Sequence, residues 1–397
     1  MKTIAKLLGL GLVLLALYGC NRQPEKRPFI TKWQGEAGET IKIAAIGTYT
    51  LTWYNEATPN ERHTQQVTVH KESDVMGTYI GNPYTFTTPT NGVYIVEVGP
   101  EGVDEMRMYF FEGARENASR LLSVVQFGDV VWKKLEEAFI DCSNLQFEKD
   151  IDVPNLSQCT SLAGMFKKCS NFNSPLEDWD VSAVTDMHDM FSHCSAFNQP
   201  LNGWNVGKIR DMSGLFYGCE RFNQPLDKWD VSAVTDMNCM FQNCSAFNQP
   251  LNGWNVGNVL DMSGMFCGCE HFNQPLDRWN VSAVTDMALM FAVCSAFNQP
   301  LNEWNVGQVK TINNMFANCQ TFNQPLDKWN VSQVTNMQSM FSGCTSFNHS
   351  LEAWDINNVP KEDGMKGIFH DCSAGELTFV KKWEAEGYNL DLDEDEL

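Results

Sequence analysis

The stretch Phe-Asn-Gln-Pro-Leu recurs along the chain at intervals of 25 residues. A fixed period of this length is typical of a structural unit stacked on copies of itself, because every layer then meets the same neighbours. No active site requires many copies of one pentapeptide, so the repeat predicts a structural array. Exact copies begin at Phe197, Phe222, Phe247, Phe272, Phe297 and Phe322, and the variants FNSPL and FNHSL begin at Phe172 and Phe347.

The second half of each unit carries apolar residues at helical spacing. In the unit of residues 194–218, Met212, Leu215, Phe216 and the following Cys219 lie at i, i+3, i+4 and i+7. This spacing predicts a short amphipathic helix with a buried stripe.

The first half of each unit predicts a turn followed by a short strand. The pattern Leu201-x-x-Trp204-x-Val206 is typical of the strand of a leucine-rich repeat (LRR). The FNQP segment before it is predicted to be a turn, because its proline cannot donate a hydrogen bond within a sheet. Asn198 and Gln199 are predicted to hydrogen-bond to their counterparts one repeat away, which would satisfy groups that stacking buries.

Residues 29–113 have a different pattern, with short alternating segments rich in Thr, Val, Tyr and Ile. Gly, Pro and Asn turns separate these segments, and no helical period lies between them. Short strands at this spacing predict a small β-sandwich.

The N-terminus predicts export and a lipid anchor. Two lysines precede an apolar run from Leu7 to Leu17, which is too short to span a membrane as a mature helix. The end of this run, Leu17-Tyr18-Gly19-Cys20, resembles the bacterial lipobox. That resemblance implies cleavage before Cys20 and lipid attached to its thiol, which would anchor the protein without a transmembrane helix.

The repeat M-F-x-x-C-x-x-F-N-Q-P-L-x-x-W-x-V-S-x-V-T-x-M resembles the units of BspA-like leucine-rich-repeat surface proteins, which use a Treponema-type variant of the repeat. The resemblance covers about residues 121–372. The segment from Pro28 is also similar to the N-terminal PKD or immunoglobulin-like module of such proteins. That module often carries a W-G-D-G turn, whereas this chain has Trp53-Tyr54-Asn55-Glu56.

The resemblance implies a lipid-anchored protein of the bacterial outer membrane or cell surface that mediates adhesion or protein recognition. Expected partners are a host or microbial surface protein or glycoprotein, and a monomer is expected. The formal net charge of -21 argues against binding nucleic acid or an anionic lipid surface through the protein's own field. The alternative is a glycan-binding or nutrient-binding component of an outer-membrane uptake complex. A sugar site would need exposed aromatic residues, and Trp53, Tyr54 and Tyr79 are the spare ones in the predicted sandwich.

The chain is predicted not to be an enzyme and to need no metal or cofactor. The histidines are scattered without metal-ligand spacing, and no hydrolase, zinc-protease or P-loop motif is present. One cysteine per unit predicts a ladder of small buried thiols. Cys239 and Cys267 lie off this ladder, and a disulfide between them is a hypothesis. The ladder cysteines are Cys142, Cys169, Cys194, Cys219, Cys244, Cys269, Cys294, Cys319, Cys344 and Cys372.

Positions that vary between units are predicted to face solvent. Two outward columns flank the repeat tryptophan, and we predict that they form a ligand face on a concave sheet. The alternative is an ordinary solvated sheet. The second column is nearly uniform Asn or Asp, so a structural ladder is the alternative there. The first outward column contains Asp178, Gly203, Lys228, Gly253, Arg278, Glu303, Lys328 and Ala353, and the second contains Asp180, Asn205, Asp230, Asn255, Asn280, Asn305, Asn330 and Asp355.

The predicted fold class is α+β. An all-β immunoglobulin- or PKD-like sandwich is followed by an LRR solenoid with one short strand and one short helix per repeat. The predicted segments are a lipoprotein signal peptide (1–19), a tether (20–28), the β-sandwich (29–113), an N-terminal cap with the first repeat (114–145), the solenoid (146–372), and a C-terminal cap with an acidic tail (373–397).

Overall fold

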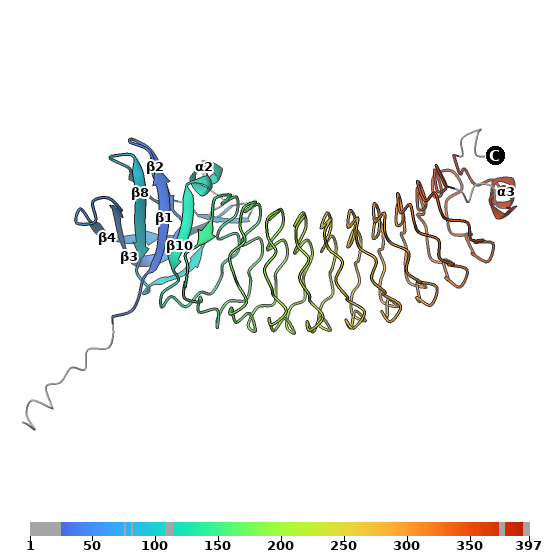
Figure 1. Ribbon diagram of the computed structural model, residues 1–397, viewed down its shortest axis with the longest axis horizontal. Helices are drawn as coiled ribbons and strands as arrows, with labels where there is room; N and C mark the ends of the chain where they lie inside the picture. The colour runs from blue at the N-terminus through green and yellow to red at the C-terminus, as the bar shows by residue number, and fades with distance from the viewer. Residues whose placement is uncertain (1–24, 75–76, 81, 108–113, 373–377, 392–397) are drawn as a thin grey trace, which may run out of the picture.

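The structure is a computed structural model that describes residues 25–74, 77–80, 82–107, 114–372 and 378–391. A β-rich N-terminal part stands at one end of a long, curved stack of coils, and helix α3 (Thr378–Ala385) lies at the other end (Figure 1). One hydrophobic core cluster includes residues of both parts, from Phe29 to Leu390. The N-terminal part and the repeats therefore share a core.

The N-terminal part is built on one mainly antiparallel sheet with the strand order β11-β10-β1-β8-β3-β4, in which β9 also pairs with β3. The pairs β2-β7 and β5-β6 form two small separate sheets. The strands are β1 (Phe29–Gly35), β2 (Thr40–Ile43), β3 (Ala45–Asn55), β4 (His63–Val69), β5 (Lys71–Asp74), β6 (Gly77–Ile80), β7 (Tyr84–Thr87), β8 (Gly92–Val98), β9 (Val103–Met106), β10 (Leu121–Gln126) and β11 (Gln146–Phe147).

The predicted immunoglobulin- or PKD-like sandwich is wrong. One seven-stranded sheet with two two-stranded sheets replaces the two sheets that such a sandwich requires. Strand β1 pairs with both β8 and β10, so the sheet is extended by a strand that follows the predicted sandwich in the sequence. Strand β11 then pairs with β10 in parallel, which carries the sheet into the first coils.

Each repeat unit is a coil of turns joined to its neighbours by parallel backbone hydrogen bonds. Parallel bridges link one residue of each unit to the same position in the next, as in Asp186 to Asp211. Alternate N–H groups continue this pattern: Asp189 donates to the Ser213 carbonyl at 2.8 Å, and Phe191 donates to the Leu215 carbonyl at 3.0 Å. Backbone groups are thus satisfied between coils.

The predicted α+β class, with an LRR solenoid of one strand and one helix per repeat, is wrong. Within the described residues, only α2 (Ala114–Ser119) and α3 are helical, and neither lies in a repeat. The predicted strand at residues 201–206 is also absent, because the inter-unit bridges lie instead at Asp211 and its equivalents.

Left-handed residues explain why the predicted helix does not form. Asp189 has φ 55° and His193 has φ 61°, and the next unit has Gly214 and Gly218 at the same two positions with φ 59° and 71°. A residue in this region at every fourth position cannot belong to an α-helix. The chain instead makes successive turns with i to i−3 hydrogen bonds, and these turns bury the same stripe of residues.

The interpretation of the FNQPL stretch is confirmed for its phenylalanine and its asparagine. Phe197 is fully buried and stacks on Phe222 with ring centroids 6.0 Å apart. The backbone N–H of Asn223 donates to Oδ1 of Asn198 at 3.0 Å, and Nε2 of Gln224 donates to the same oxygen at 3.1 Å. The Asn198 amide thus pairs with the next layer as predicted, whereas the Gln224 amide reaches Asn198 and not its counterpart Gln199. The predicted turn at residues 197–200 is an irregular segment.

The interpretation of the cysteine ladder is also confirmed. All ten ladder cysteines are buried free thiols. The Cys194 thiol donates to the Phe166 carbonyl at 3.0 Å, and the thiols of the following units repeat this contact. The ladder thus serves packing and satisfies one carbonyl in each layer.

Candidate functional site

Both outward columns face solvent. Every residue of the first and second columns is exposed, although the segment that carries them is irregular and not a strand. Between the columns, Trp204 and its equivalents are buried, with at most 5% of each side chain exposed. The core tryptophan therefore fixes the position of both columns in every layer.

The second outward column closes a turn after each tryptophan. Oδ1 of Asp180 accepts the backbone N–H of Ser182 at 3.0 Å, and Oδ1 of Asn205 accepts that of Gly207 at 3.3 Å. The remaining units repeat this bond. Hydrogen bonds from Ser232 lower the pKa of Asp230, and the bond from its side chain has the largest effect. A structural role therefore accounts for the uniform Asn or Asp at this position.

The first outward column combines a fixed backbone with varied side chains. The N–H of Lys228 donates to Oδ1 of Asn202 in the preceding unit at 3.0 Å, and Nδ2 of Asn202 donates to Asp227 at 2.9 Å. Units 50 residues apart repeat this Asn and Asp pairing.

The cations of the first column differ in their partners. Lys328 forms an ion pair with Glu303. Lys228 and Arg278 form no ion pair with any residue that the structure describes. The column therefore presents two unpaired cations on an acidic protein.

A second variable surface was missed by the sequence analysis. We define the turn face as the two left-handed positions of each unit, which carry Asp189 and His193 in one unit and Leu289 and Val293 in another. Leu289 is 40% exposed and Val293 is 43% exposed. The signal was present in the sequence, since these positions vary from unit to unit as much as the first outward column does.

One group of described side chains has the composition of a metal site. Ligand atoms of Asp186, His188 and Asp211 lie within 4.8 Å of one another. Sequence spacing did not reveal this group, because stacking of adjacent units brings Asp211 close. Nδ1 of His188 and Oδ1 of Asp186 are 2.8 Å apart, and this hydrogen bond raises the pKa of His188. Mutual pairing therefore satisfies Asp186 and His188 without an ion.

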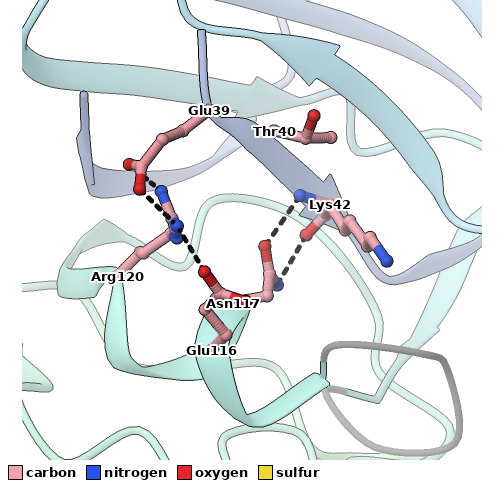
Figure 2. A pocket seen from close by; sticks show the side chains of 6 residues that line it. All are labelled: Glu39, Thr40, Lys42, Glu116, Asn117 and Arg120. Atoms are coloured by element: carbon pink, nitrogen blue, oxygen red, sulfur yellow. Dashed lines mark hydrogen bonds and ion pairs between the residues drawn. The ribbon is translucent and has the colours of Figure 1, made fainter. Parts of the chain in front are cut away.

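A polar cavity of about 230 Å³ lies where α2 meets β2 (Figure 2). The side-chain amide of Asn117 brackets the backbone of Lys42, accepting its N–H at 2.8 Å and donating to its carbonyl at 3.0 Å. Arg120 pairs with both Glu39 and Glu116. Because these groups satisfy one another, the arrangement works as a clamp between α2 and β2.

The aromatic residues considered for sugar binding are covered where the structure describes them. The Trp53 ring lies between His63 and Phe86, with centroid distances of 4.0 and 4.3 Å and near-parallel planes. The guanidinium of Arg62 lies over the Tyr54 ring at 4.2 Å. The side chain of Tyr79 lies outside the described side chains.

The off-ladder cysteines are free thiols in half-buried positions. Burial raises the pKa of Cys239 to about 11 and also raises the pKa of Cys267. A thiol with a raised pKa is a poor nucleophile at neutral pH. The predicted lipid-carrying residue, Cys20, lies outside the described residues. Within the described residues, no helix has the length and apolar character needed to cross a membrane.

Comparison with known proteins identifies the repeats. A family model described as "Mycoplasma protein of unknown function, DUF285" matches residues 133–250, 200–302 and 276–383. These overlapping matches cover more than half of the chain and establish a tandem repeat protein. No curated protein and no solved structure matches the chain significantly.

Proposed function

The chain belongs to the DUF285 family, and we propose that it is a non-enzymatic, lipid-anchored protein of the outer membrane or cell surface that recognises a partner protein or glycoprotein. The repeat array carries this recognition, and lipid on Cys20 holds the protein at the membrane. The resemblance to BspA-like surface proteins supports the location and the role in adhesion.

The observation that carries the proposal is the contrast between a uniform core and a varied, rigidly held first outward column. The backbone of Lys228 is fixed by Asn202, while its side chain has no ion pair with a described residue. Arg278 is held in the same way by Asn252. A surface ordered before binding loses less entropy when a partner docks. Unpaired cations on a fixed backbone therefore favour recognition of an acidic patch on the partner.

A protein partner is favoured over the glycan alternative. Sugar sites commonly use an open aromatic face, whereas both faces of Trp53 are stacked and Arg62 lies over Tyr54. The repeat tryptophans are buried in the core. We therefore place the partner contacts on the charged first column.

The test reverses the three basic charges of the first column in one variant, Lys228→Glu, Arg278→Glu and Lys328→Glu. Beads coated with the full-length protein are scored for adherence to immobilised matrix glycoproteins and to bacterial cells. We expect adherence of the variant to fall about tenfold, because charge reversal opposes an acidic partner surface.

The matched control also reverses three basic charges, at exposed positions of the array that lie outside both outward columns. It is Lys208→Glu, Arg221→Glu and Lys310→Glu. The control is expected to adhere like the unmodified protein. Equal adherence of all three proteins would show that the first column does not carry recognition.

A further inference from the structure

A cavity of about 400 Å³ lies at the N-terminal end of the repeat array. Two segments from successive coils form it, residues 147–153 and 175–179, and the first begins at the last residue of β11. Its apolar wall includes Phe147, Ile151 and Trp179. The volume lies within the range of cavities that bind small ligands or side chains.

The cavity occurs where the tryptophan column begins. Later in the array, tryptophans stack on one another, as Trp229 does on Trp254 with centroids 6.4 Å apart. Trp179 is the first of the column, and Phe147 stacks against it at 6.0 Å. The preceding coil has residues 148–153 in place of the Pro-Leu-x-x-Trp segment of later units. The missing tryptophan leaves space beside Trp179.

The same break leaves an indole N–H without a protein partner. The seven later repeat tryptophans donate Nε1 to a leucine carbonyl of the preceding unit, as Trp204 does to Leu176 at 2.9 Å. Trp179 is only 5% exposed, and its Nε1 has no hydrogen-bond partner among the described residues. Unlike Nε1 of Trp132, which is fully buried, Nε1 of Trp179 remains accessible. The cavity therefore offers one donor that a ligand can use.

Five carboxylates line the same cavity as this donor. Two of the lining carboxylates are already paired, Glu148 with Lys32 and Asp152 with Arg27. The other three are exposed and form no ion pair with a described residue. Against them the lining has one cation, Lys149. The unpaired carboxylates are Asp150, Glu177 and Asp178.

We propose that this cavity binds a peptide segment of a partner protein that carries Arg or Lys. A backbone carbonyl of the segment accepts the Trp179 N–H, the methylene stem lies along Phe147 and Ile151, and the cationic head pairs with Glu177 and Asp178. Basic side chains commonly bury their stems on apolar surface while the charge stays at the polar rim. The inference rests on the proposed function in taking a protein as the partner.

The test titrates the full-length protein with two capped pentapeptides, Gly-Arg-Gly-Arg-Gly and the same sequence with Glu for Arg, by calorimetry at low salt. We expect saturable binding of the Arg peptide and none of the Glu peptide. Glu177→Gln with Asp178→Asn is expected to weaken binding about fivefold, as the loss of two exposed ion pairs predicts. Trp179→Phe keeps the ring packing, removes the donor, and is expected to weaken binding by a similar factor.

Two control variants separate the site from general attraction to an acidic protein. Glu220→Gln with Glu270→Gln removes two exposed carboxylates elsewhere on the array. Trp279→Phe removes an indole donor whose acceptor, the Leu251 carbonyl, lies away from the cavity. Both are expected to bind the Arg peptide within twofold of the unmodified protein. Absence of saturable binding, an equal loss in the Glu220 and Glu270 variant, or unchanged binding by Trp179→Phe would overturn the inference. Asp178 also belongs to the first outward column. The charge-reversal variants of that column change Lys228, Arg278 and Lys328 and leave the cavity intact, so the two proposals can fail separately.

Discussion

Replacing Gly268 by Ala distinguishes coils of turns from repeat helices, because the two arrangements predict opposite changes in stability. Gly268 has φ 77°, where an L-residue costs roughly 1–2 kcal/mol. Alanine also reduces the conformational freedom of the unfolded chain, which offsets about 0.4–1 kcal/mol of this cost. The added Cβ would lie 2.4 Å from Oδ1 of Asn243, so that amide must also shift. We expect a net loss of about 1 kcal/mol, whereas in a helix the substitution would stabilise by about 0.5–1 kcal/mol.

The measurement is urea unfolding followed by the fluorescence of the buried repeat tryptophans. Gly203→Ala is the matched control, because Gly203 lacks a left-handed φ and a Cβ there would meet nothing within 4 Å. The control is expected to be neutral or slightly stabilising. An increase in the free energy of unfolding for Gly268→Ala would refute the left-handed turn and with it the reason given for the absence of repeat helices.

Three further predictions concern titratable groups. The hydrogen bond to Asp186 raises the pKa of His188. The stabilisation that this bond gives is therefore present below the unfolded pKa of about 6.5 and is lost as pH rises through the folded pKa. His188→Asn should lower the urea midpoint more at pH about 5.5 than at about 8.5. Burial raises the pKa of Asp236, so the ionised carboxylate opposes folding. Asp236→Asn should raise the urea midpoint at neutral pH, and this gain should disappear once the carboxylate is protonated in acid. An unchanged urea midpoint at neutral pH would contradict this. In the native protein, iodoacetamide should label Cys239 and Cys267 before any ladder cysteine, because the ladder cysteines are buried whereas these two are half-buried. Mass spectrometry of peptides from timed samples checks the order.

The buried residues of the repeats could be predicted from the sequence, whereas their backbone conformation could not. Met212, Leu215, Phe216 and Cys219 are all buried, as their spacing predicted. Successive i to i−3 turns bury the same spacing as a helix does, so periodicity alone does not separate the two. The glycines of alternate units were the available signal, but Asp, His, Leu and Val at the same positions concealed it.

The N-terminal part shows a similar limit. Alternating segments predicted strands where β3, β4 and β8 lie. The pairing of β1 with β10 joins residues far apart in the sequence, and local patterns do not specify such partners.

The candidate sites were predictable only in part. The exposure of both outward columns could be predicted from their variation or from their place beside the tryptophan. Asp180 and its equivalents close a turn, which matches the structural role that was the alternative to ligand binding for the second column. The cavity at Trp179 depends on which residues stack against the first tryptophan, and repeat comparison alone does not give that packing. Its sequence signal is the absence of a repeat tryptophan before Trp179.

Accessibility of the protein on intact producing cells tests the central claim most directly. Cells are treated with a protease that cannot cross the envelope, and loss of the repeat region is followed with an antibody, with lysed cells as the reference. Our account predicts cleavage on intact cells and binding of the antibody to untreated cells. Protection until the envelope is broken would contradict a surface-exposed recognition protein.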